Sequence, residues 1–310
     1  MQLNFRTLSV LVLTALTIGT SCKKESTPKT DDPATEMAAQ SDDEYQVAGE
    51  TDAITNDINL IIESNVSLSG RMQNPTSLIC DAAITAEETN GLRKMTITYN
   101  GSDCAGSRTR SGTVVFSLPS GVYWKTAGAA LTVDFQNVTI TRQSDHKSIT
   151  LNGTFTITNV SGGRLTDLLT QSSIIHTLNS NQLSITFSDG TQRTWQVARK
   201  REYTYNSGLA ITVTGTHTNG ANTNIAEWGT NRFGIAFTTS ITQPLVFRQD
   251  CNFRLTSGQV RHDRQGASAT VTFGLNAEGN AISCPGSGSY YYKLSWTGIG
   301  GNTHSVILPY

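Results

Sequence analysis

The sequence predicts an all-β protein built from antiparallel meanders, arranged as a sandwich or as one long curved sheet. Short segments in which β-branched or aromatic residues alternate with polar residues recur from residue 95 to residue 308, and such alternation is typical of strands with one buried face. Turn dipeptides such as Asn100-Gly101 and Asp189-Gly190 separate these segments. No segment between them is long enough for the crossover helix that a parallel sheet needs, so the alternation favours antiparallel pairing.

The expected strands are short and follow one another closely along the chain. In order, they cover residues 95–99, 113–117, 131–135, 148–151, 154–158, 183–187, 194–198, 202–205, 210–214, 233–237, 244–247, 252–255, 269–273, 290–294 and 304–308.

One short N-terminal helix is expected between Thr51 and Ser69. Its apolar residues recur every three or four positions, at Ile54, Ile58, Ile61, Ile62 and Val66. Asp52 and Asp57 lie near its start, where the helix dipole favours acidic residues. We expect the apolar stripe to pack against the sheet. A weaker helical turn is expected from Leu165 to Gln171.

Residues 1–21 have the pattern of an export signal. Arg6 precedes an apolar run from Leu8 to Ile18, which is too short to span a bilayer. The segment Ile18-Gly19-Thr20-Ser21-Cys22 resembles the lipobox of bacterial lipoproteins, although Gly19 stands where leucine is usual. The resemblance implies that Cys22 is acylated and anchors the protein to a membrane. An ordinary secreted protein whose Cys22 forms a disulfide is the alternative.

Residues 22–50 are expected to form a disordered acidic tether. This segment has almost no large apolar residue and, from residue 23 onward, a net charge of −5. Such a composition buries too little surface to offset the entropy of ordering. Residues 51–310 carry a net charge of +3, and this nearly neutral body excludes binding to nucleic acid through a broad basic face.

Four further cysteines predict two local disulfides, Cys80 with Cys104 and Cys251 with Cys284. The alternative, a zinc site of four thiolates, is disfavoured because the chain has no Cys-x-x-Cys spacing. Each pair is accompanied by a similar order of strand, glycine turn and Gly-Ser. The sequence therefore leaves open whether residues 51–163 and 164–310 form two similar β lobes or parts of one sheet.

Several segments resemble a group of uncharacterised lipoproteins from Bacteroidota. They include Asp189-Gly-Thr-Gln-Arg-Thr-Trp195, Gly229-Thr-Asn-Arg-Phe-Gly234 and Thr242-Gln-Pro-Leu-Val246, and the resemblance covers most of residues 78–297. It implies placement in the cell envelope, most simply at the outer membrane, and an all-β body. It implies no catalytic residue.

The sequence contains none of the motifs that would indicate a catalytic centre, a metal site or a cofactor. It has no His-Glu-x-x-His, no Gly-x-Ser-x-Gly and no phosphate-binding glycine loop. Its five histidines are scattered singly. We therefore expect a protein that is not an enzyme and needs no cofactor. A glycan-active hydrolase stays open as an alternative, because two carboxylates could still meet across a cleft.

Aromatic residues in apparent loops suggest a site for ligand binding. Tyr123, Trp124 and Trp228 lie among glycine, lysine, threonine and asparagine, and exposed rings of this kind stack on sugars. The alternative is that the aromatic rings of this chain fill the core of the sheet. The sequence as a whole indicates a membrane-anchored, non-enzymatic binding or structural component of the bacterial envelope. Its expected partners are the membrane, through Cys22, and a glycan or another envelope protein.

Overall fold

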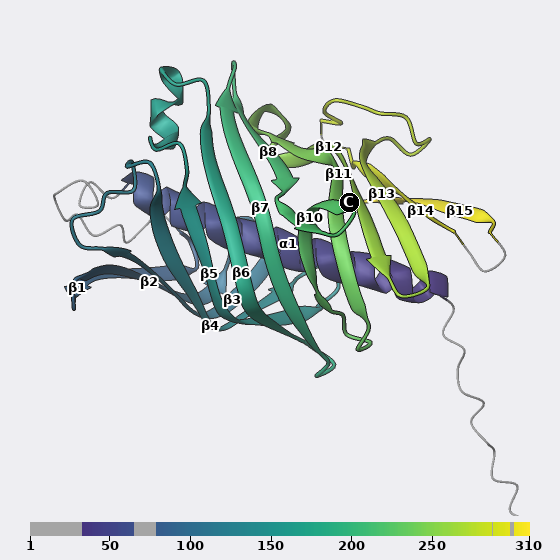
Figure 1. Cartoon of the computed structure of the whole chain (residues 1–310), viewed down its shortest axis with the longest axis horizontal. Helices are drawn as coiled ribbons and strands as arrows, with labels where there is room; N and C mark the ends of the chain where they lie inside the picture. The colour runs from purple at the N-terminus through teal and green to yellow at the C-terminus, as the bar shows by residue number, and fades with distance from the viewer. Residues whose placement is uncertain (1–32, 65–78, 287, 298–300) are drawn as a thin grey trace, which may run out of the picture. The chain divides into compact units, whose positions relative to one another are not determined.

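A computed structural model describes residues 33–64, 79–286, 288–297 and 301–310 of the chain. Within these residues, one antiparallel sheet of fifteen strands accompanies a single long α-helix, α1 (Pro33–Ser64), and two short 3-10 helices, η1 (Leu165–Leu169) and η2 (Gln249–Cys251) (Figure 1). The predicted all-β class with one N-terminal helix is confirmed. The sheet takes the long curved form, and the weak helical turn near residue 165 is η1.

Most strands are longer than the alternating segments that predicted them. They are β1 (Ala82–Thr89), β2 (Leu92–Ser102), β3 (Arg108–Pro119), β4 (Ala129–Arg142), β5 (Ser148–Asn159), β6 (Ile174–Phe187), β7 (Gln192–Tyr205), β8 (Leu209–Gly215), β9 (His217–Asn219), β10 (Asn222–Thr230), β11 (Ala236–Arg248), β12 (Arg254–Arg264), β13 (Ala267–Leu275), β14 (Tyr291–Thr297) and β15 (Thr303–Pro309). Strands β5 and β7 each join two segments that were expected as separate strands.

Most strands pair with their neighbours in sequence, as in a meander. The order runs from β1 to β7 and then from β10 to β15. Strands β8 and β10 share one place in the sheet, because each pairs with a different part of β7 and of β11. At their junction Gly215 lies so close to Asn224 that an added Cβ would meet the carbonyl oxygen of Asn224 at 2.0 Å. Only glycine fits there.

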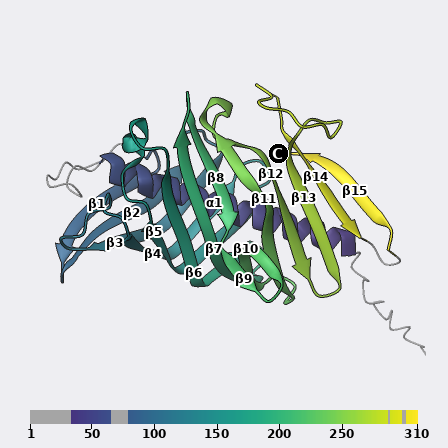
Figure 2. The same ribbon diagram turned by 45° about the horizontal axis from the view of Figure 1, so that its top comes forward.

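The sheet curves around α1, which crosses the strands on the inner face (Figures 1 and 2). The C-terminal half of α1 packs into the main hydrophobic core. Ile54, Ile58 and Ile61 are completely buried there among inward residues of β1 to β7. The expected apolar stripe is thus confirmed over Ile54 to Ile62, whereas Val66 lies outside the described residues. No helix among the described residues is long and apolar enough to cross a bilayer.

The prediction of a disordered tether is wrong for residues 33–50, because α1 begins at Pro33 rather than near Thr51. The carboxylates of this segment do not remain in water. Asp43 pairs with Arg232, and Glu50 pairs with Arg108 at 2.6 Å between Oε2 and Nη1. Basic residues of the sheet thereby compensate a composition that would keep an isolated segment unfolded. The expected export signal, Cys22 and residues 23–32 lie outside the described residues.

The expected boundary between two lobes at residues 163 and 164 does not interrupt the sheet. It falls between β5 and η1, and β5 pairs directly with β6 across it. The buried apolar residues nevertheless form two clusters. One joins α1 to β1–β7, and the second joins η1 to strands β6–β8 and β10–β14 and contains no residue of α1.

Both predicted disulfides are present. Cys80–Cys104 joins the residues just before β1 and just after β2, and Cys251–Cys284 joins η2 to the loop after β13. The Cα atoms are 5.2 and 5.4 Å apart, respectively. Each bridge therefore closes one two-stranded hairpin, β1–β2 in the first case and β12–β13 in the second.

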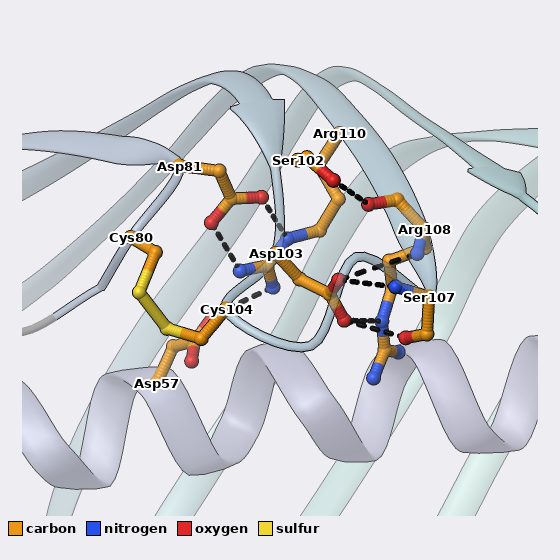
Figure 3. The surroundings of a disulfide bond; sticks show 9 residues. All are labelled: Asp57, Cys80, Asp81, Ser102, Asp103, Cys104, Ser107, Arg108 and Arg110. Atoms are coloured by element: carbon orange, nitrogen blue, oxygen red, sulfur yellow. Dashed lines mark hydrogen bonds and ion pairs between the residues drawn. A yellow bond between two sulfur atoms is a disulfide. The ribbon is translucent and has the colours of Figure 1, made fainter.

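Arg110 on β3 connects the first disulfide hairpin to α1 (Figure 3). Its guanidinium donates to both carboxylate oxygens of Asp81 at 2.7 Å and, through Nη1, to Asp57 of α1 at 2.7 Å. The Asp81 side chain is completely buried. The ring of Tyr99 lies 4.1 Å from the guanidinium carbon, and its hydroxyl donates to Asp57 at 2.8 Å. Arg110 therefore neutralises two carboxylates that have little access to water.

We expect Arg110→Met to lower the free energy of unfolding by about 3–5 kcal/mol, because Asp81 would remain buried without its counter-ion. Urea denaturation followed by circular dichroism measures the change. Arg261→Met is the matched control, since Arg261 pairs with Asp263 at the surface and such pairs contribute less than about 1 kcal/mol. Equal losses in the two variants would contradict this role of Arg110.

Candidate functional site

The three aromatic residues singled out in the sequence do not form one platform. Trp124 is only 3% exposed, and its ring packs edge-on against His176 with ring centres 5.0 Å apart. Tyr123 is exposed in the loop after β3, beneath the guanidinium of Arg93. Trp228 lies on β10 rather than in a loop, stacked on His217. The prediction that the Trp124 ring is open to a ligand is wrong, because the ring belongs to the main core.

Tyr123 and Trp228 are also far apart along the sheet. Tyr123 precedes β4, and strands β5, β6 and β7 separate β4 from β10. Four strand spacings correspond to roughly 19 Å along the sheet. One small glycan therefore does not contact both rings.

A cavity of about 530 Å³ lies between α1 and the C-terminal strands. The α1 residues that line it include Ser41, Ala48, Gly49 and Ala53, which recur on one face of the helix. These side chains are too short to reach the sheet. The cavity lies on a different face of α1 from Ile54, Ile58 and Ile61, where the helix carries small residues instead.

The wall opposite α1 is largely apolar. It is formed by inward-facing residues of β8, β11, β12 and β13, which belong to the second hydrophobic cluster or pack against it. They include Ile211, Val213, Ile241, Val260, Val271 and Phe273. Tyr45 of α1 and Phe253 after η2 also line the cavity, and each is 45% exposed. These two rings mark the place where the cavity opens to solvent.

Charged side chains form the remaining part of the lining. Arg199 and Arg201 project from the same face of β7, because they are two residues apart on one strand. Both contact Oδ1 of Asp52 on α1, and Arg199 also contacts Glu227 of β10. Glu44 and His262 line the cavity as well. An apolar wall and a cluster of buried charges thus border the same space.

Glu44 and His262 form a buried ion pair between α1 and β12. The distance from Glu44 Oε2 to His262 Nδ1 is 2.7 Å, and the hydroxyl of Thr239 donates to the same carboxylate. Burial alone would raise the pKa of Glu44, but His262 and Arg193 outweigh it and lower this pKa to about 2. Burial alone would lower the pKa of His262, but the Glu44 carboxylate reverses the effect and raises it. The pair is therefore charged on both sides near pH 6.

The pKa of Glu227 is shifted in the opposite direction from that of Glu44. Burial raises the pKa of Glu227 in spite of the nearby guanidinium of Arg199. One of its carboxylate oxygens, Oε2, is buried and has no hydrogen-bond partner among the described residues. Arg193 lies 3.7 Å from both Glu44 and Glu227 and connects them.

The described residues offer one group with the spacing of metal ligands, Asp250, Cys251 and Cys284. Its two cysteines form a disulfide, so neither sulfur is a thiolate that could bind a metal.

Comparison of the chain with protein-family models, with curated proteins and with solved structures finds no match.

The cavity was not predicted from the sequence, although the sequence contains one signal of it. The small residues Ser41, Ala48 and Ala53 occur at helical spacing within the acidic segment. That spacing acquires meaning only once residues 33–50 are known to be a helix, since in an extended tether these residues share no common face.

We expect His262→Gln to remove a pH-dependent part of the stability. The pKa of His262 is higher in the folded protein than its ordinary value of 6.5. The stabilisation is thus complete below about pH 6.5 and is lost as the pH rises through the raised pKa. On the acid side, Glu44 stabilises the fold above its ordinary pKa of 4.5, and this contribution declines as the pH falls towards 2. The difference in Tm between wild type and His262→Gln should therefore be largest between about pH 4.5 and pH 6.5.

Thermal unfolding from mildly acidic to alkaline pH measures this difference. The matched control is His304→Gln, because His304 is exposed on β15 and should show a difference that varies little with pH. A constant difference between wild type and His262→Gln across the whole range would contradict the charged pair.

Proposed function

We propose that this protein is an exported, lipid-anchored component of the bacterial envelope that binds a small, largely apolar ligand without transforming it. The observation that carries the proposal is the cavity between α1 and the apolar inner face of β8, β11, β12 and β13. Its volume of about 530 Å³ falls in the range of about 300–1,000 Å³ that is usual for small-molecule sites.

Ligand binding explains an arrangement that packing alone does not favour. An unfilled apolar space loses dispersion contacts and leaves apolar surface in water. Larger residues at Ala48 or Ala53 would fill part of this space. A ligand that occupies the space would supply the missing contacts.

Three features support an extracytoplasmic location. The signal-like residues 1–21 precede Cys22 in a segment that resembles a lipobox. Both cysteine pairs in the body are disulfides, and disulfides are typical of oxidising compartments. The resemblance to Bacteroidota lipoproteins agrees with an outer-membrane location.

A binding role agrees better with the charged residues than a hydrolytic role does. Glu44 is held by His262 and Arg193, and Glu227 contacts Arg199. Two carboxylates fixed in buried ion pairs are poorly placed to act as acid and nucleophile on a glycosidic bond. Recognition of a glycan through stacked aromatic rings has less support, because Trp124 is buried.

An uncharged naphthylamine dye, whose fluorescence rises in apolar surroundings, tests the cavity directly. Wild-type protein should bind it saturably with one dye per chain. Gly49→Trp should weaken binding at least about tenfold, since the new indole would replace the contacts of a small apolar ligand. Gly49 tolerates a side chain because no atom lies within 4 Å of an added Cβ.

Leu60→Trp is the matched control, because Leu60 is exposed on the same helix and does not line the cavity. This variant should bind the dye like the wild type, with circular dichroism showing that both variants are folded. Saturable binding that is equal in Gly49→Trp and wild type would exclude the cavity as the site. Absence of saturable binding to the wild type would contradict the proposed function.

A further inference from the structure

We infer that the ligand of this cavity is an anionic amphiphile, whose apolar chain lies along β8, β11, β12 and β13 and whose anionic head binds Arg199 and Arg201. The inference rests on the proposed function, because it names the class of ligand for the same cavity. Three observations carry it: the position of the two arginines, their supply of hydrogen-bond donors, and the balance of buried charge.

Arg199 and Arg201 lie at the cavity without being open to bulk water. Their exposed fractions are 5% and 2%, and both line the cavity. A guanidinium that is shielded from bulk solvent interacts more strongly with an anion than one at the surface. The apolar residues Ile211 and Val213 of the adjacent strand β8 line the same space. A single ligand can therefore contact both the charged and the apolar parts of the lining.

The two arginines have more donors than the surrounding carboxylates use. Each guanidinium carries five N–H groups in a fixed arrangement. Asp52 accepts through a single oxygen, Oδ1, from both residues, and Glu227 accepts from Arg199 through Oε1. The Nε atoms of Arg199 and Arg201 are buried and have no hydrogen-bond partner among the described residues. A carboxylate or phosphate oxygen would satisfy such donors.

The buried charges around Arg199 and Arg201 carry a net positive charge, which favours an anionic ligand. Arg193, Arg199, Arg201 and the protonated His262 stand against three carboxylates, those of Glu44, Asp52 and Glu227. One positive charge is left without a counter-charge in this group. Burial also raises the pKa of Glu227 and so works against its charged form. An anionic head would compensate the excess charge.

Competition against the uncharged dye tests the inference with three ligands that share one chain: dodecanoate, dodecan-1-ol and dodecylamine. The titrations use full-length protein near neutral pH, with each ligand below its critical micelle concentration. Dodecanoate should displace the dye at a concentration about tenfold or more below that needed for dodecanol, since hydrogen bonds to charged groups have about this effect. Dodecylamine should be the weakest competitor.

Arg201→Met should reduce the preference for dodecanoate over dodecanol to less than about threefold, because half of the head-group contacts are removed. Arg261→Met is the matched control. Arg261 lies on the exposed face of β12 and does not line the cavity, so this variant should keep the preference. Asp52→Asn provides a second test that does not depend on the folding of Arg201→Met. It removes the competing carboxylate and should increase the preference for dodecanoate.

The outcomes separate the inference from the proposed function. Equal displacement by dodecanoate and dodecanol, or stronger displacement by dodecylamine, would overturn the anionic ligand and leave an apolar-ligand site in place. A wild-type protein that binds neither the dye nor any of the three ligands would overturn the proposed function itself. A preference for dodecanoate that is unchanged in both Arg201→Met and Asp52→Asn would place the head group elsewhere and contradict the role of these arginines.

Discussion

Ion pairs between α1 and the sheet hold the helix in place, and both the main core and the cavity depend on that placement. The helix contains eight carboxylates and no lysine or arginine. Seven of them pair with basic side chains on β3, β4, β7 and β12 and in the turn after β10. The eighth, Glu63, accepts a hydrogen bond from the backbone of Leu165. A sheet lined with arginines and a helix lined with carboxylates are each unfavourable alone, because either would bury charge without a partner. Together they neutralise each other.

Two faces of α1 serve different purposes under this constraint. On one face, Val47 and the isoleucines fill the space inside β1–β7 and complete the main core. On the other, Asp52 pairs with Arg201, and small residues such as Ala48 and Ala53 leave the space towards β11–β13 open. The cavity is thus held by electrostatic contacts rather than by close apolar packing. Asp52, Arg199 and Arg201 both hold α1 on the sheet and line the cavity. Ligand binding at this site is therefore linked to the stability of the helix.

The sequence predicted those features that depend on neighbouring residues. Alternation located most strands but missed β9, β10 and β1, the last because Ala82–Thr89 is dominated by alanine, threonine and glutamate. The local disulfides followed from cysteine spacing. The helix before Thr51 was missed because composition indicates only how much apolar surface a segment can bury. The partner that stabilises Asp43 in the helix, Arg232, lies 189 residues away in the sequence. Trp124 was placed at the surface because its neighbours in sequence are polar, although the ring packs on His176 of β6. The cavity depends on the register of α1 against the sheet, which no local pattern specifies.

Amide hydrogen exchange of residues 40–50 in the full-length protein shows whether the acidic segment is a helix packed against the sheet. Helical hydrogen bonds buried beneath strands exchange only through opening of the structure. We expect these amides to be protected as strongly as those of Ile54 to Ile62, which lie in the main core. Exchange of residues 40–50 at the rate of an unfolded peptide, with residues 54–62 protected, would contradict this expectation and restore the acidic tether.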